Sequence, residues 1–151
     1  MPTLFEDTFV VDTVDADGRK FDLVSRLEAH SDKFDMRLKL DVNVDVYPLN
    51  KSQQRFVLLL ADTLNLDGTR DPEEGVYTEA LMQGKPSLAD KYEYVMYGKV
   101  FKVVPGAVGG AAHEIIASFG GLLMSLKGAA QELKDLKRDL RVFILIRKVD
   151  V

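Results

Sequence analysis

Apolar and polar residues alternate strictly from residue 34 to residue 46, in the stretch FDMRLKLDVNVDV. Each even-numbered residue there is apolar and each odd-numbered residue is polar. Successive side chains of a β-strand point to opposite faces, so this alternation predicts a long strand with one face on the core and the other in water. Pro48 has no backbone N–H to donate to a neighbouring strand, and we expect the strand to end there.

Three other segments are apolar without alternation. The run RFVLLLADTL, which begins at Arg55, favours a strand covered on both faces, although the period alone leaves a helix open. The run LRVFILIRKV (140–149) is also apolar at even and odd positions, and so is YEYVMYGKVFKV (92–103). A strand at the surface of a lone domain has one polar face. The second face of the strand at 92–103 therefore needs a cover.

Shorter apolar segments predict further strands, and two of them flank DADGRK, whose Asp17-Gly18 pair is a turn signal. One clear helix candidate is AAQELKDLKRD (129–139), in which Leu133 and Leu136 form a narrow apolar stripe. The further predicted strands are 4–14, 21–29, 113–119 and 121–128.

About eight strands with little helix predict an all-β fold, either an antiparallel barrel or a sandwich. Long strands joined by short turns favour the barrel, which leaves no free edges. We expect a single domain over residues 1–151, because a chain of this length buries one sizeable core. Residues 65–91 have no period and predict a long mobile loop, whose central VYTEALM would dock as a short segment. Residues 105–112, PGAVGGAA, predict a second flexible loop.

Composition limits the class of protein and the cellular compartment that we expect. Hydrophobic residues make up 46% of the chain and charged residues 29%, which is ordinary for a globular protein. No apolar run reaches the about 20 residues that a membrane helix needs, and the first residues are acidic where a signal peptide would be basic. The absence of cysteine excludes disulfides and thiolate metal ligands. It fits a reducing compartment, so we expect nucleus or cytosol.

The net charge of −4 argues against a protein that binds nucleic acid without a partner protein, because contacts with phosphate groups supply most non-specific affinity. Acidic residues outnumber basic ones 16 to 9 in residues 1–75, whereas basic residues outnumber acidic ones 11 to 8 in residues 76–151. This asymmetry either orients the protein on a larger assembly or reflects solvated faces that happen to differ.

Candidate catalytic and cofactor sites are scarce. The two histidines, His30 and His113, stand in β-rich segments without co-ligands. No nucleophile elbow, phosphate-binding loop or zinc-protease motif occurs. Asp15 and Asp17 fail as a calcium loop, because the first and twelfth ligand positions would be Thr13 and Val24. We therefore predict no enzyme activity, no cofactor and no metal.

The paired glycines of SFGGLLMSLKG, Gly120 and Gly121, lead into a strand-like run rather than a helix, so they do not predict a phosphate cradle. Glycine in a strand marks a bulge, a bend or the close approach of another backbone. Gly98, between Tyr97 and Lys99, has the same interpretation.

Nucleic-acid binding is the sharper alternative function. Single-strand binders with small Greek-key barrels combine aromatic side chains on a strand face with basic residues. One segment supplies this combination, although aromatic residues in strands more often serve a core or an interface. The residues concerned are Tyr94, Tyr97, Lys99, Phe101 and Lys102.

Several motifs carry a family resemblance. LFEDTF, GRKFDLVSRL, LDVNVDVYP, YVMYGKV, SFGGLLMSLKG and RVFILIRK resemble, in this order, the small subunit shared by eukaryotic nuclear RNA polymerases I, II and III, the eighth in size order. The similarity runs from about Leu4 to Lys148. It lapses at residues 65–91 and 105–114.

The resemblance implies a closed or nearly closed oligonucleotide-binding-like barrel with a pseudo-twofold arrangement of strands. It also implies a non-catalytic subunit that docks on the outside of the largest polymerase subunit, away from the active site and its metal ions. The other polymerase subunits would be further partners, and the nucleus, including the nucleolus, would be the location.

The predicted dock lies where the two most distinctive motifs stand, because Tyr and Met suit interfaces and glycines allow a second backbone to approach. The alternative for each residue is that it serves only the barrel. Two other function classes stay open: a stand-alone single-stranded nucleic-acid-binding barrel, and an enzyme whose site we could not assemble. The predicted dock residues are Tyr94, Met96, Tyr97, Gly98, Lys99, Gly120, Gly121, Leu122 and Met124.

Overall fold

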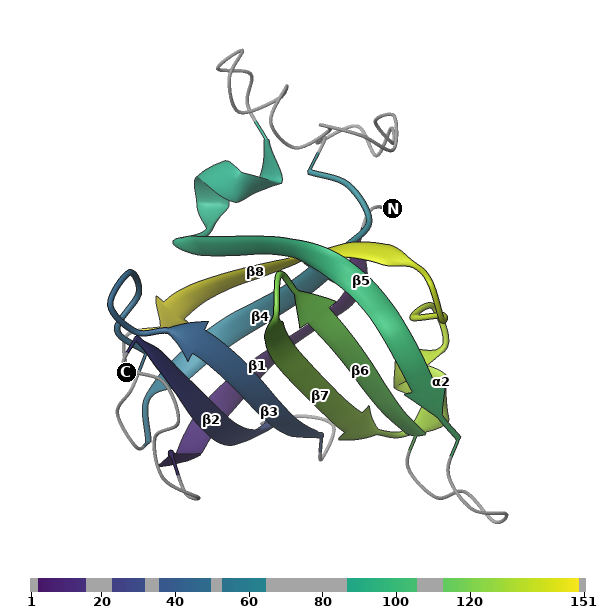
Figure 1. Cartoon of the computed structure of the whole chain (residues 1–151), viewed down its shortest axis with the longest axis horizontal. Helices are drawn as coiled ribbons and strands as arrows, with labels where there is room; N and C mark the ends of the chain where they lie inside the picture. The colour runs from purple at the N-terminus through teal and green to yellow at the C-terminus, as the bar shows by residue number, and fades with distance from the viewer. Residues whose placement is uncertain are drawn as a thin grey trace.

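The computed structural model describes residues 3–15, 23–31, 36–49, 53–64, 87–105 and 113–149. Eight antiparallel strands of these residues close into one barrel in the order β1-β2-β3-β7-β6-β5-β8-β4 (Figure 1). This confirms the predicted all-β barrel of about eight strands. The strands are β1 (Thr3–Val14), β2 (Val24–Ser31), β3 (Arg37–Asn43), β4 (Arg55–Ala61), β5 (Tyr94–Val104), β6 (His113–Phe119), β7 (Leu122–Gly128) and β8 (Arg141–Val149).

The barrel consists of two halves with the same connectivity. In each half three consecutive strands pair in sequence, and the fourth strand returns to pair with the first, which is the Greek-key order. One half is β1 to β4 and the other is β5 to β8. The halves meet twice, at the β4–β8 pair and at the β3–β7 pair. This repeat of connectivity agrees with the pseudo-twofold arrangement that the family resemblance implies.

Strands β4 and β8 are covered on both faces, as their apolar runs predict. Phe56, Leu58 and Leu60 of β4 face the barrel interior, while Leu59 and Ala61 belong to a second apolar cluster on the outside. In β8 the even-numbered residues from 142 to 146 join the interior and the odd-numbered ones join the outer cluster. The pairing of these two strands therefore separates the two clusters.

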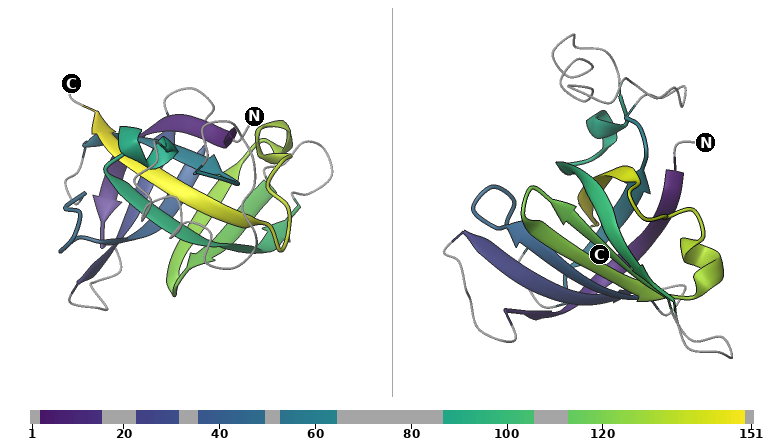
Figure 2. Two further views of the ribbon diagram at one scale, coloured as in Figure 1. Left: turned by 90° about the horizontal axis from the view of Figure 1, so that it is seen from above. Right: turned by 45° about the vertical axis from the view of Figure 1, so that its right-hand side comes forward.

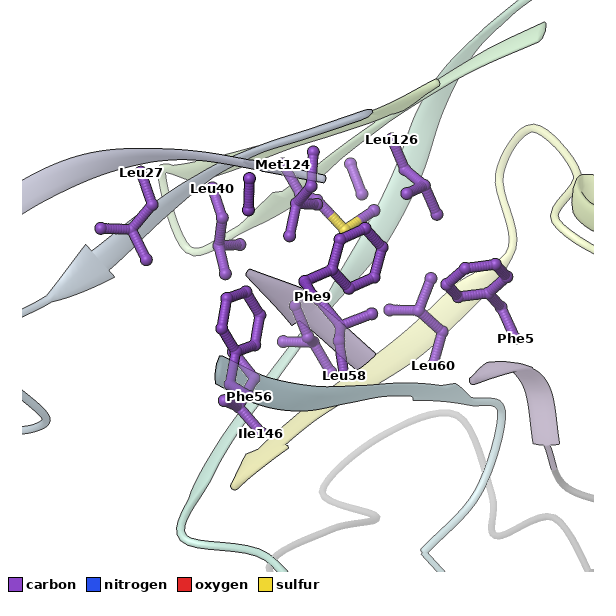
Figure 3. Close-up of a cluster of buried hydrophobic side chains, with 14 of the residues drawn as sticks. Phe5, Phe9, Leu27, Leu40, Phe56, Leu58, Leu60, Met124, Leu126 and Ile146 are labelled. Carbon is purple, nitrogen blue, oxygen red and sulfur yellow. The ribbon is translucent and has the colours of Figure 1, made fainter. Parts of the chain in front are cut away.

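Large side chains fill the barrel interior (Figure 3). Phe9 and Phe56 stack with their ring centroids 5.9 Å apart and an interplanar angle of 21°. Leu27, Leu40 and Met124, from β2, β3 and β7, approach them from the opposite wall, and all are almost fully buried. Each such side chain contributes roughly 1.5–3 kcal/mol through burial.

The alternating segment at 34–46 forms a shorter strand than predicted. Strand β3 ends at Asn43, because the Asn43 side-chain carbonyl accepts hydrogen bonds from the backbone N–H groups of Asp45 and Val46, at 3.1 and 3.2 Å. A short polar side chain that bonds the backbone two or three residues ahead favours a turn over a strand. Residues 44–46 accordingly turn, and Val46 is 70% exposed. Phe34 lies outside the described residues.

The predicted helix at 129–139 is also shorter than expected. Helix α2 covers only Ala130–Leu133, and Ala129 at its N-cap has no side chain that caps the backbone. Turns follow, and the N–H of Asp139 donates to the carbonyl of Val100, which brings the chain back to β5. Both members of the predicted apolar stripe, Leu133 and Leu136, are nonetheless buried in the barrel core.

The predicted loop at 65–91 ends in regular structure. Residues 88–91 form a 3₁₀-helix, η1 (Leu88–Lys91), which Ser87 and Asp90 cap reciprocally. Residues 65–86, the Asp17-Gly18 turn signal and residues 106–112 lie outside the described residues. Among the described helices, none has the length and apolar character to cross a membrane.

The substitution Leu133→Ala tests the role of the short helix in the core. Because Leu133 is 2% exposed, we expect its truncation to lower the free energy of unfolding by about 2–4 kcal/mol. The exposed neighbour Lys134 is the control, since Lys134→Ala should change it by less than about 0.5 kcal/mol. Urea unfolding with an unchanged m-value measures both. Equal effects of the two substitutions would show that α2 is not part of the core.

Candidate docking surface

Strand β5 crosses the tip of the β6–β7 hairpin at Gly98. A Cβ atom at Gly98 would lie 2.0 Å from the carbonyl oxygen of Ser118 and 2.7 Å from Cδ1 of Phe119. The pairing of β5 with β6 begins at the next residue, Lys99, opposite Ser118. The structure thus brings together the two sequence segments that contain the predicted dock, 94–99 and 120–124. The close approach that Gly98 permits is within the chain.

Gly120 and Gly121 form the two-residue turn of the β6–β7 hairpin. Phe119 and Leu122 pair on either side of them, and both glycines have positive φ angles, +64° and +97°. Positive φ at both positions is typical of a type I′ turn, which suits the twist of hairpins. A Cβ atom at either glycine would meet nothing within 4 Å. The turn therefore presents bare backbone to its surroundings. Of the three alternatives that the sequence left open, a bulge, a bend and the close approach of another backbone, the chain itself shows a tight turn.

The outer face of β5 is partly covered by the chain itself. Tyr97 packs on Phe143 of β8 with ring centroids 4.7 Å apart, and Val95 lies against the same outer cluster. Leu88 and Ala89 of η1 pack on this cluster too. Figure 2 shows η1 over β8 and β5 on the outside of the barrel. The end of the segment 65–91 is thus one cover for the second face of β5.

Hydrogen bonds hold η1 on the outer cluster. The Leu88 N–H donates to the Leu64 carbonyl at 2.9 Å, and the Tyr92 hydroxyl donates to Glu6 at 3.3 Å. The Arg147 guanidinium stands 6.0 Å from the Tyr92 ring centroid. Burial raises the pKa of Tyr92, and the nearby Glu6 carboxylate acts in the same direction.

Three of the predicted dock residues face the barrel interior. The Tyr94 ring stacks on Tyr47 at 5.1 Å, and its hydroxyl accepts from the Asn43 N–H at 3.3 Å. Met96 packs against the inner core with its sulfur 3.3 Å from the Tyr94 hydroxyl. Met124 is 1% exposed. These positions support the alternative that the three residues serve the barrel, so any effect they have on a dock is indirect.

A polar cluster lies beside Tyr94, where Tyr47 meets Glu93 and Lys148. The Tyr47 hydroxyl donates to the Glu93 carboxylate, which also accepts from the backbone N–H of Lys148 at 2.8 Å. The Lys148 ammonium lies 4.8 Å from the Tyr47 ring centroid. The Lys148 N–H and the Tyr47 hydroxyl lower the pKa of Glu93, whereas burial and the bond to Glu93 raise the pKa of Tyr47.

Five predicted residues remain on the outside, and we call them the tip surface. Lys99 has a side chain 52% exposed, 3.8 Å from the Asp139 carboxylate. Tyr97 and Leu122 are half-buried, and the two turn glycines are exposed. The tip surface thus combines an aromatic ring, a cation and open backbone within one region. It comprises Tyr97, Lys99, Gly120, Gly121 and Leu122.

Sequence reasoning missed one exposed apolar residue of this region. Leu123 is 39% exposed, because its side chain points to the opposite face of β7 from its inward-facing neighbour Met124. Because alternate residues of a strand point to opposite faces, assigning a face to each residue of β7 would have identified Leu123 as outward-facing.

No group of three or more His, Cys, Asp or Glu among the described residues is placed to hold a metal ion. His30 lies 2.7 Å from the Asp12 carboxylate on the outer side of the barrel. The side chain of Asp7 is buried in the interior, where one carboxylate oxygen accepts from the Thr8 N–H at 2.7 Å.

Comparison with known proteins gives one family. The family model described as RNA polymerase Rpb8 matches residues 6–148. An Arabidopsis thaliana protein named DNA-directed RNA polymerases II, IV and V subunit 8B is 47% identical, over 97% of this chain and 96% of its own length. The Dictyostelium discoideum DNA-directed RNA polymerases I, II, and III subunit rpabc3 is 46% identical, with 96% of both chains covered. The Saccharomyces cerevisiae protein named DNA-directed RNA polymerases I, II, and III subunit RPABC3 is 38% identical, over 97% of this chain and 98% of its own.

The substitution Gly98→Ala tests the close crossing of β5 over the hairpin. Its methyl group would collide with backbone, which cannot move aside as a side-chain end can, so we expect a loss of about 1–3 kcal/mol in the free energy of unfolding. Gly120→Asn is the control: asparagine tolerates positive φ and finds open space, so stability should stay within about 0.5 kcal/mol. Comparable stability of Gly98→Ala and the wild type in thermal unfolding would contradict the crossing.

The substitution Glu93→Gln tests the charge of the Glu93 carboxylate, because glutamine retains an oxygen that accepts both hydrogen bonds. The folded pKa of Glu93 lies below its unfolded value, so its charge stabilises the fold above the unfolded pKa. This contribution disappears as the pH falls through the folded pKa. We expect the wild type to be slightly more stable than Glu93→Gln at neutral pH and equally stable in acid. A difference that does not change with pH would assign the effect to shape rather than charge.

Proposed function

The chain belongs to the RNA polymerase Rpb8 family, and we propose that it is a non-catalytic structural subunit of the nuclear RNA polymerases, docked on their largest subunit. The observation that carries this proposal is the family match from residue 6 to residue 148, together with relatives that align over nearly their whole length. Their printed names are those of polymerase subunits. Transcription is then an activity of the assembly, to which this chain contributes structure.

The tip surface supports a dock on another protein. Aromatic residues are enriched at interfaces because they bring a large contact area. The turn Gly120-Gly121 leaves room for a second backbone, since a Cβ atom there would meet nothing within 4 Å. Beneath the surface, Tyr94, Met96 and Met124 fill the barrel and hold β5 and β7 in place. The interior residues thus stiffen the surface that the outer residues present.

The largest subunits of polymerases I, II and III are the partners that we infer for the tip surface, with other polymerase subunits as neighbours. The family resemblance supports the largest subunit as the partner, and the names of the relatives support the three polymerases only. A protein of these three polymerases works in the nucleus, and the polymerase I assembly extends the location to the nucleolus.

A stand-alone single-stranded nucleic-acid binder is the alternative. Of its five proposed residues, Tyr94 faces the interior and Tyr97 packs on Phe143, which leaves Phe101 as the one exposed ring. Lys99 and Lys102 are exposed, but the chain carries a net charge of −4. Binders of this kind stack successive bases on several aromatic rings, so the geometry favours the structural subunit.

Affinity purification of the C-terminally tagged chain from native extract, at moderate salt, tests the proposal. We expect the wild type to recover the largest subunits of the nuclear polymerases in amounts equal to its own. Gly120→Asn and Lys99→Glu should lower this recovery several-fold, because one adds a side chain at the bare turn and the other reverses an exposed charge. Lys134→Glu, a charge reversal at the C-cap of α2, should not lower it.

Two outcomes would count against the proposal, and they differ. Full recovery with both folded variants would show that the tip surface is not the dock. Recovery of the chain alone, or with nucleic acid that is lost as salt rises, would reject the subunit role and favour the free binder.

A further inference from the structure

A buried carboxylate lies beside the tip of the β6–β7 hairpin. Asp41 of β3 is only 7% exposed, whereas Arg37 and Lys39, which share its face of the strand, are exposed. Asp41 therefore stands on the outward face of the barrel but is covered there. A buried charge needs partners that compensate for the loss of water. The Arg26 guanidinium and the Leu123 backbone N–H supply them.

The guanidinium orients the carboxylate. Arg26 and Asp41 stand opposite each other in the β2–β3 pair. Arg26 Nε donates to Asp41 Oδ1 at 2.7 Å, and Arg26 Nη2 donates to Asp41 Oδ2 at 3.1 Å. Two parallel bonds of this kind fix the plane of the carboxylate as well as its position. The backbone of Arg26 is held in turn at the end of β1, where Asp15 Oδ1 accepts from the Arg26 N–H at 3.0 Å.

The carboxylate extends the contact between β3 and β7 beyond their backbone pairing. The pairing ends with Leu40 opposite Met124, and the same register would next place Asp41 opposite Leu123. At that position the Leu123 N–H donates to Asp41 Oδ2 at 3.0 Å. A hydrogen bond to a charged acceptor is about twice as strong as one between neutral groups. The side chain of Asp41 thus holds the start of β7 next to the glycine turn.

Other contacts hold the opposite flank of the hairpin. Strand β5 crosses it at Gly98, beside the Ser118 carbonyl, and the Ser118 hydroxyl accepts from the Gly121 N–H at 3.3 Å. These contacts fix the turn relative to β5 and β6, while the bond to Asp41 fixes it relative to β3. The two turn glycines have no side chains to pack, so the bonds at the flanks set the position of the turn.

We propose that Asp41, oriented by Arg26, is a positioning residue for the dock. Its bond to the Leu123 N–H sets the position in which the hairpin presents the tip surface to the partner. Asp41 acts through Leu123 rather than by touching the partner, because its side chain is buried. This inference rests on the proposed function, since it takes the tip surface as the dock.

The alternative is that the ion pair between Arg26 and Asp41 serves only the pairing of β2 with β3. Stability alone does not separate the two roles, because a buried ion pair can often be replaced by uncharged side chains of similar volume without loss. A backbone N–H that loses its acceptor has no such replacement. Two double variants that both lack the ion pair, and differ only in the acceptor, therefore isolate the bond to Leu123.

The first double variant, Arg26→Met with Asp41→Asn, removes both charges and keeps a side-chain oxygen that accepts from the Leu123 N–H. The second, Arg26→Met with Asp41→Leu, has a side chain of similar shape at position 41 and no acceptor. Amide hydrogen exchange in NMR spectra of the full-length chain measures how firmly the Leu123 N–H is held. The Leu126 amide, in the paired part of β7, is the internal reference. Affinity purification of the tagged chain measures the dock, and thermal unfolding shows that each variant is folded.

We expect the Leu123 amide of the Asp41→Leu double variant to exchange at least about ten times faster than that of the wild type. Recovery of the largest polymerase subunit should fall several-fold. The Asp41→Asn double variant should restore slow exchange and most of the recovery. Glu28→Gln is the matched control, because Glu28 stands in the same strand pair but faces Lys39, and it should change neither measurement.

Equal results for the two double variants, in exchange or in recovery, would overturn the inference and assign any effect to the ion pair. Full recovery with the Asp41→Leu double variant would also overturn it. If Gly120→Asn and Lys99→Glu still lower recovery in that case, the tip surface remains the dock and only the role of Asp41 is rejected. If they do not, the tip surface is not the dock and both assignments fail.

Discussion

The antiparallel pairing of β4 with β8 is the constraint on which the rest of the structure depends. It joins the two Greek-key halves along seven residue pairs, from Arg55 opposite Val149 to Ala61 opposite Phe143. Both strands are apolar on both faces, so their inner side chains fill the barrel and their outer ones need a separate cover. The outer cluster, the position of η1 and the orientation of Tyr97 all follow from this double burial.

Sequence patterns predicted the fold best where burial decides the structure. Apolar residues at both even and odd positions of β4 and β8 correctly indicated strands with two covered faces. On β5 the chain covers the second face only in part. The predictions lost accuracy where one side chain or one missing cap decides. The side-chain oxygen of Asn43 ends β3 early, and Ala129 offers no cap to α2. Neither effect is visible in a hydrophobic period.

The candidate site was predicted in part for the same reason. The two motifs that carry the family resemblance, with their Tyr, Met and Gly residues, selected the segments 94–99 and 120–124. The proximity of these segments arises from the crossing at Gly98, which needs the strand order of the barrel. The alternation of faces along each strand explains why Tyr94 and Met124 point inward while Tyr97 and Leu123 point outward. The bulge at Phe101 leaves a trace in the sequence, because the inward apolar position moves from the even-numbered Val100 to the odd-numbered Val103. Lys102 is thereby kept out of the core.

The double burial of β4 has a consequence for biosynthesis. Each Greek key is a continuous stretch of chain, yet β4 lies 80 positions ahead of β8, from Ala61 to Arg141. At translation rates of about 5–20 residues per second, the nascent chain carries β4 for roughly 4–16 s before its partner strand exists. During that interval both apolar faces of β4 and one of its edges lack their final cover. The first half of this protein therefore carries aggregation-prone apolar surface and an unpaired strand edge until β8 has been synthesised.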